Sequence, residues 1–228
     1  MNILRCSIPI QWWIKLILSS VLMILSLTSC AFADQMMKNL FPVQSQEYLL
    51  WDDFSNSDSG WKTWEKGGSS ISYHNNGLRI LVNSPHFDYW SVAGQRFGDV
   101  RIEVDATKLG GPDDNDFGIL CRYQGENNYY GLIVSSDGYY GIIKMKHGRL
   151  ALIGQEQLQF SQDIRRGQQT NHLRADCKGN ELVLYVNGKK LMAAQDDDFQ
   201  AGDVGLLAGS YQTPGVDIIF DNFLVRKP

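Results

Sequence analysis

Basic clusters, closely spaced metal-ligand motifs and long helical patterns are all missing from this chain of 228 residues. No run of lysine or arginine occurs, and the formal net charge is −4. Nucleic-acid binding needs a basic patch that neutralises phosphates, so we expect no nucleic-acid partner. The four histidines do not recur at metal-ligand spacing, and no G-x-S-x-G nucleophile elbow is present. No period of 20 to 50 residues repeats, which excludes propellers and solenoids.

The first 29 residues have the composition of an export signal. Arg5 and Lys15 are followed by the apolar run LILSSVLMILSLTS, and no acidic residue precedes Cys30. The run is too short to cross a bilayer comfortably, because a spanning helix needs ~20 apolar residues. We predict that residues 1–29 are a signal peptide that is removed.

The end of this signal, Leu27-Thr28-Ser29-Cys30, resembles the bacterial lipobox. The resemblance implies that Cys30 is acylated and becomes the first residue of the mature protein. Two or three acyl chains hold a protein on a membrane far better than one. We therefore expect a lipoprotein, membrane-anchored on the periplasmic or cell-surface side, with residues 30–47 as lipidated Cys30 and tether. The alternative is an ordinary signal peptide cut near the A-x-A-like site at 31–33.

Cysteines are few, and each has its own explanation. None shows the close paired spacing of a zinc site or a redox dithiol. Cys6 lies in the segment expected to be removed, which leaves Cys121 and Cys177 as the only two in the exported domain. Because the compartment favours oxidation, we predict that these two form a disulfide. Two buried free thiols on separate strands are the alternative.

From residue 48 onward, short apolar runs alternate with turn residues at near-regular spacing. The stretch Phe117–Met145 reads as three strands of an antiparallel meander, with turns at 124–127 and 135–138. Asn-Gly pairs at 76–77 and 187–188 predict tight hairpins. The polar stretch 155–169 is the one place that suits a single helical turn. About a dozen strands without a long helix predict an all-β sandwich or barrel over residues 48–228.

The order of several segments carries a family resemblance that covers about residues 48–228. These segments are DDFS…GW, GDVRIEVDATKLGGPDDNDFGILCRYQ, YYGLIVSSDGYYGIIK, TNHLRADCKGNELVLYVNGK and GDVGLLAG…VDIIFDNFLVRKP. They resemble the concanavalin A-like, laminin-G-like jelly-roll domains of bacterial exported proteins. The branch they resemble most is grouped with 3-keto-disaccharide hydrolase domains or family-16 glycoside hydrolase-like proteins. The resemblance implies two packed antiparallel sheets and a saccharide-related role.

A catalytic reading of this resemblance centres on Glu103 and Asp105. Retaining glycosidases need two carboxyl groups ~5 Å apart, and family-16 enzymes place them in an E-x-D-x-E or E-x-D-x-x-E strand. Here the position of the second glutamate is Thr107 or Lys108. Glu103 and Asp105 therefore stay as weak catalytic candidates, with solvated surface acids as the simpler explanation.

Calcium is the one cofactor that the acids suggest. Asp113, Asp114 and Asp116 supply oxygen ligands in a loop, and many concanavalin-like domains carry a structural ion. The EF-hand pattern fails here, because position 12 would be Gln124. We expect no cofactor, with calcium at these aspartates as a low-probability alternative to a polar turn.

Carbohydrate sites combine flat aromatic rings with a few polar groups. Alternation along a strand places Tyr129 and Tyr130 on opposite faces, and does the same for Tyr139 and Tyr140. The ring that shares a face with Arg122 is then the binder, and its neighbour belongs to the core. The residues that fit this inventory are Arg122, Tyr129, Tyr130, Tyr139, Tyr140 and Trp90.

The sequence as a whole predicts a lipid-anchored, non-catalytic β-sandwich that binds a carbohydrate or a glycan-bearing partner. A glycoside hydrolase-like enzyme acting on a di- or polysaccharide is the first alternative. A structural envelope protein without a small ligand is the second, because aromatic rings also fill the cores of sandwiches.

Overall fold

Alternating β-branched and aromatic residues form the strands of residues 48–228, the part of the chain that the computed structural model describes. The predicted signal peptide, lipidated Cys30 and tether lie outside the described residues. Sixteen strands occur between residues 48 and 228, and all their pairings are antiparallel. No helix in this range is long and apolar enough to cross a membrane.

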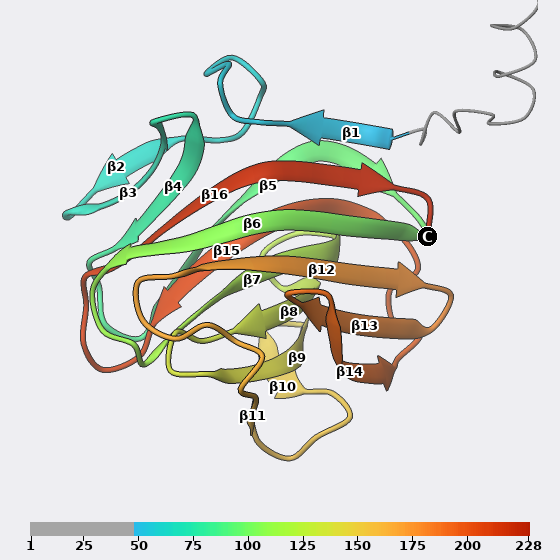
Figure 1. Cartoon of the computed structure of the whole chain (residues 1–228). Coiled ribbons are helices and arrows are strands. Elements are labelled where there is room, and N and C mark those ends of the chain that lie inside the picture. Colours follow the sequence, from blue (N-terminus) through green and yellow to red (C-terminus); the bar gives the residue numbers. More distant parts are fainter. Residues whose placement is uncertain (1–47) are drawn as a thin grey trace, which may run out of the picture. The chain divides into compact units, whose positions relative to one another are not determined.

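The strands form two sheets, which we call sheet A and sheet B (Figure 1). Sheet A has the order β14-β13-β12-β6-β16-β4-β3-β2, with β1 beside β16, and sheet B has the order β10-β9-β8-β7-β15-β5, with β11 beside β9. The strands of sheet A are β1 (Tyr48–Asp52), β2 (Trp64–Lys66), β3 (Ser69–His74), β4 (Gly77–Val82), β6 (Val100–Gly110), β12 (Thr170–Lys178), β13 (Glu181–Val186), β14 (Lys189–Gln195) and β16 (Val216–Arg226). The strands of sheet B are β5 (Phe87–Phe97), β7 (Asn115–Tyr123), β8 (Asn128–Val134), β9 (Tyr139–Lys146), β10 (Arg149–Leu152), β11 (Gln159–Phe160) and β15 (Gly202–Ser210).

The main core lies between the two sheets. In β6 the residues Val100, Ile102 and Val104 point inward and are fully buried, and the charged residues between them face outward. This is the pattern that the alternation predicts. Strands β7 and β8 are buried on both faces, so sheet B has a second apolar layer on the face turned away from sheet A.

A disulfide joins Cys121 of β7 to Cys177 of β12, as predicted from the sequence. The two Cα atoms are 6.9 Å apart, and both side chains are buried in the main core. Because β7 belongs to sheet B and β12 to sheet A, the bond links the two layers of the sandwich.

Two local predictions need correction. The hairpin between β3 and β4 takes its positive φ angles from Asn75 and Asn76, while Gly77 already belongs to β4. The helical turn predicted within 155–169 is wrong: this segment is irregular except for β11, which pairs with β9. Pairing along a sheet edge satisfies backbone groups that an isolated single turn would leave open.

Candidate functional site

The face of sheet B that is turned away from sheet A, here called the outer face, carries a second apolar cluster. Its buried members are Leu120, Tyr129, Ile133, Ile143 and Leu207, and half-buried rings and aliphatic chains pack around them. Glycines alternate with these side chains. A Cβ at Gly141, for example, would collide with side-chain atoms of Gln155 and Leu158. The loop after β10 can therefore lie close against the sheet and form a wall.

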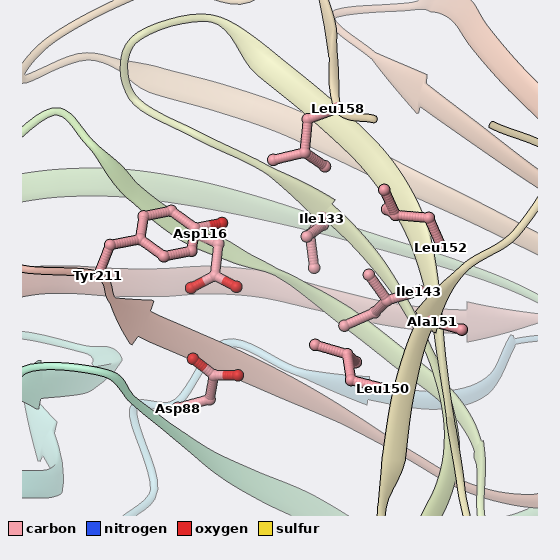
Figure 2. Close-up of a pocket in the computed structure, with 9 residues that line it drawn as sticks. All are labelled: Asp88, Asp116, Ile133, Ile143, Leu150, Ala151, Leu152, Leu158 and Tyr211. Carbon is pink, nitrogen blue, oxygen red and sulfur yellow. The ribbon is translucent and has the colours of Figure 1, made fainter. Parts of the chain in front are cut away.

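This wall encloses a cavity of about 290 Å³ on the outer face. Figure 2 shows the side chains that surround it. Most of its surface is aliphatic, from Ile133, Ile143, Leu150, Ala151, Leu152 and Leu158. Its polar groups come from Asp88 of β5, Asp116 of β7 and Tyr211, which follows β15. A mostly apolar lining with a few polar groups is the usual composition of a ligand pocket.

The two acids of this cavity meet over a single glycine. Gly209 of β15 pairs with Asp88 on one side and with Asp116 on the other. A Cβ at Gly209 would collide with the Oδ1 atoms of both carboxylates. The two carboxylates therefore turn toward each other across the space that the glycine leaves free, as Figure 2 shows.

Burial makes this pair electrostatically unusual. Asp116 is only 5% exposed, and its Oδ1 has no hydrogen-bond partner. Burial, followed by the negative charge of Asp88, raises the pKa of Asp116 well above its ordinary value. Burial also raises the pKa of Asp88. A buried carboxylate beside a half-buried one disfavours the ionised form of both, so this site favours a proton or another positive group.

A second cavity of about 350 Å³ adjoins the first, and the two share Leu158 and Tyr211. Asp114, Ser135, Asp137, Tyr139 and Gln157 complete its lining. We call the two cavities together the acidic groove.

Carboxylates dominate the charge of the acidic groove. Burial raises the pKa of Tyr211, and the charges of Asp116, Asp88, Asp114 and Asp137 raise it further, in that order. Within residues 48–228, neither cavity is lined by a lysine or an arginine. The groove therefore has a negative potential that no lining cation offsets.

An exposed aromatic pair lies at the end of the second cavity. Tyr139 is 42% exposed, and its ring meets that of Phe160 edge to face, with centroids 5.7 Å apart. Tyr139 was predicted as a ligand contact, whereas Phe160 was not.

The other predicted rings divide between the two faces as alternation requires. Tyr130 and Tyr140 are buried in the main core, so one ring of each adjacent pair does point inward. Trp90 and Tyr129 lie on the outer face, but Tyr129 is only 3% exposed beneath its neighbours. Trp90 Nε1 donates a hydrogen bond of 3.2 Å to the hydroxyl of Tyr123, a ring that the sequence reasoning did not select.

Comparisons with known proteins bear on the fold. No family model matches the sequence, and no curated protein does either. Among solved structures, the carbohydrate-binding module CBM66 from Bacillus subtilis has a TM-score of 0.58 at 17% identity, covering 74% of this chain and 96% of that chain. The β-glucanase of Bacillus licheniformis has a TM-score of 0.57 at 14% identity, covering 81% of this chain and 100% of that chain. The fold is that of the concanavalin A-like jelly rolls.

Part of a larger protein has the same architecture. The GH43 protein BlXynB of Bacillus licheniformis has a TM-score of 0.58 at 17% identity, covering 80% of this chain and 40% of that chain. The two-sheet antiparallel jelly roll predicted from the sequence is thus confirmed.

Arg122 of this jelly roll does not lie where the sequence predicts. The prediction that it shares an exposed face with the binding rings is wrong, because Arg122 is 1% exposed. Its Nη1 donates to the carbonyl of Phe199 at 2.8 Å, and its Nη2 donates to Asp99 at 3.2 Å. A φ of 53° at Arg122, where the register of β7 against β15 shifts, breaks the alternation within β7, and Tyr123 packs on the outer face instead.

Glu103 and Asp105 lie on the outward face of sheet A, in an ion-pair network. Glu103 accepts a hydrogen bond of 2.5 Å from Arg226, and His172 lies between the two acids, 2.8 Å from Asp105. The hydrogen bond from His172, followed by that from Arg226, lowers the pKa of Glu103 to about 2. The contact with Glu103 first, and that with Asp105 second, raise the pKa of His172 to about 8. These two acids therefore lie outside the acidic groove.

The three predicted calcium ligands are spread apart. Asp113 pairs with the ammonium of Lys108, Asp114 lines the second cavity, and Asp116 belongs to the pair over Gly209. Within residues 48–228, no group of three or more His, Cys, Asp or Glu side chains converges as a metal site would require. Calcium binding stays a prediction.

The sequence reasoning missed Asp88 and Tyr211. A signal for Asp88 exists, because alternation in β5 places it on the same face as Trp90. The sequence does not predict that Asp88 and Asp116 meet, because their proximity depends on the register of β5 and of β7 against β15.

Proposed function

We propose that this jelly roll binds a carbohydrate in the acidic groove and does not cleave it. The observation that carries the proposal is the buried Oδ1 of Asp116, which has no hydrogen-bond partner, on a residue that lines a mostly aliphatic cavity. A buried polar atom without a partner is costly unless a ligand satisfies it. Sugars offer both hydroxyl donors for the carboxylates and apolar C–H faces for the aliphatic wall.

The exposed pair of Tyr139 and Phe160 supports the same proposal. Rings at the rim of a pocket offer flat surfaces on which a pyranose face can stack. A ligand longer than one sugar unit would extend from the first cavity through the second toward Tyr139. The names of the similar structures, a carbohydrate-binding module and a β-glucanase, add support for a carbohydrate ligand.

Hydrolysis is the second candidate function, and the acid pair with raised pKa values is the observation in its favour. Its geometry argues against it. Retaining glycosidases hold their carboxyl groups ~5 Å apart, on either side of the scissile bond. A Cβ built on Gly209 would collide with the Oδ1 atoms of both Asp88 and Asp116. These two oxygens are therefore too close together for a glycosidic bond to lie between them. Binding without cleavage is therefore the better reading.

We further propose that Cys30 anchors the protein by lipid on the periplasmic or cell-surface side, where glycans are its partners. The lipobox-like end of the signal run supports this location.

The test is a glycan array probed with the full-length protein in a detergent that has no sugar headgroup. We expect binding by the wild type, weaker binding by Tyr139→Ala, and unchanged binding by Tyr48→Ala. Tyr48 is a matched control, because it is also an exposed tyrosine but lies on β1 of sheet A. Absence of binding to any saccharide at millimolar concentration would leave the structural envelope role, and shortened glycans would establish hydrolysis.

A further inference from the structure

The acidic groove contains more negative charge than recognition of a neutral sugar requires. Asp88 and Asp116 face each other over Gly209, and Asp114 and Asp137 line the adjoining cavity. A further feature points to a ligand: the Oδ1 of Asp116 is buried and unpartnered, and Asp116 belongs to the residues that line the cavity. Figure 2 shows both carboxylates of the pair directed at the space between them.

We infer that the groove takes a saccharide with a protonated amine, whose ammonium group lies over Gly209 between Asp88 and Asp116. This inference rests on the proposed carbohydrate function and names its ligand class.

The physical reason is the mismatch between a hydroxyl and this pair of acids. A hydroxyl donates one hydrogen bond and leaves the carboxylates of buried Asp116 and half-buried Asp88 close together. An ammonium group has three donors, so it can bond both carboxylates at once and cancel part of their repulsion. Buried charges are tolerated when they are paired. Burial raises the pKa of both acids, and at Asp116 the negative charge of Asp88 raises it further, which is the repulsion that a cation between them would reduce.

A metal ion fits this position less well. Calcium takes six to eight oxygen ligands, whereas two carboxylates meet over Gly209 and the rest of the first cavity is mostly aliphatic. Within the part of the chain that the structure describes, no group of three acidic or metal-ligating side chains forms. A compact ammonium on a sugar ring with apolar C–H faces matches both features of the cavity.

The glycine between the acids offers a sharp variant. The φ of Gly209 lies outside the left-handed region, so its backbone accepts alanine. The new methyl group would project between the two carboxylates, displace both of them and crowd the space above the glycine where the ammonium is expected. Gly98→Ala is the matched control, because a Cβ at Gly98 meets nothing within 4 Å.

The experiment is a calorimetric titration of full-length protein with glucosamine trimers and with N-acetylglucosamine trimers, in which each amine is converted to an uncharged acetamide. We expect the amine form to bind at least about tenfold more tightly, the factor that one charge-assisted contact supplies. Asp116→Asn and Gly209→Ala should remove this preference, while Gly98→Ala should keep it. Asp58→Asn, an exposed acid outside both cavities, should also keep it and so exclude non-specific attraction of a cationic sugar.

Three results would overturn the inference. Equal affinity for the two trimers would mean a neutral-sugar site. If Asp58→Asn lost the preference for the amine trimer as fully as Asp116→Asn, the preference would come from the general negative charge of the protein. Stoichiometric calcium binding that displaces the amine trimer would mean a metal site. In each case a neutral glycan that still binds on the array would leave the proposed function standing, so the two failures can be told apart.

Discussion

At the residue scale, Tyr139 and Tyr140 are neighbours in β9 with opposite environments. Tyr140 is buried in the main core, and its hydroxyl has two acceptors for its one proton, Gln159 Oε1 at 3.0 Å and the carbonyl of Leu191 at 3.3 Å. We predict that Tyr140→Ala lowers the free energy of unfolding by about 3–5 kcal/mol, the usual cost of truncating a buried ring. Tyr139→Ala should leave the urea midpoint nearly unchanged. Equal midpoints for the two variants would contradict this division.

His172 makes a second prediction at this scale. Its pKa in the folded protein is raised to about 8, first by Glu103 and then by Asp105. A raised folded pKa means that the charged contact stabilises fully below the unfolded value of ~6.5 and is lost as the pH rises through about 8. The melting temperature of His172→Gln should fall below that of the wild type at about pH 6, with the difference shrinking by about pH 9. A constant difference would show that the charge on His172 is not involved. The effect should be modest, because the ring is half exposed.

Alternation within a strand predicts many of these residue environments. It correctly separates Tyr129 from Tyr130 and Tyr139 from Tyr140. It fails at Arg122, because one positive φ breaks the alternation within β7 and turns the side chain inward. Which acids meet across a sheet depends on pairing between distant strands, and a single sequence does not carry that register.

At the element scale, the disulfide between β7 and β12 links the two sheets. The cysteines are 56 positions apart, so in the chain-entropy model their bond stabilises the fold by about 4 kcal/mol. We predict that reduction lowers the melting temperature of the wild type by roughly 8–16 °C for a domain of this size. The double variant Cys121→Ala and Cys177→Ala should melt low with or without reductant. The role would be contradicted if the wild type, reduced while unfolded in denaturant and then refolded, melted at the same temperature as the untreated protein.

The strands themselves follow from short-range chemistry, since β-branched residues and turn pairs recur along the domain. The segment 155–169 does not, because its polar residues suit either a turn of helix or an irregular loop. Its packing on β9 depends on Gly141, whose missing side chain leaves room for Gln155 and Leu158. The wall of the candidate site is thus decided by a tertiary contact.

At the scale of the whole molecule, the lipobox-like sequence at 27–30 predicts where the protein is held. Cys30→Ser should release the protein from the membrane fraction into the soluble fraction, because the acyl chains supply the membrane affinity. Intact-mass measurement of the wild type should give a chain that begins at lipidated Cys30. An unlipidated chain that begins at Asp34 would support the ordinary signal peptide instead.

We expect the Asp116 carboxylate to contribute to ligand affinity and not to the stability of the fold. Asp52 is the matched comparison: it is also buried, but its carboxylate accepts hydrogen bonds from Trp61 Nε1 and from the backbone of Phe54. Removing a satisfied buried acceptor costs about 1–3 kcal/mol, whereas removing an unpartnered buried charge relieves a desolvation cost.

The most direct test measures the melting temperature and the glycan dissociation constant of Asp116→Ala and Asp52→Ala, with the strongest ligand from the array. We predict that Asp116→Ala melts at or above the wild-type temperature and binds at least about tenfold more weakly. Asp52→Ala should melt lower and bind as the wild type does. A destabilised Asp116→Ala protein with unchanged affinity would contradict the account, because the carboxylate would then serve the fold and not the ligand.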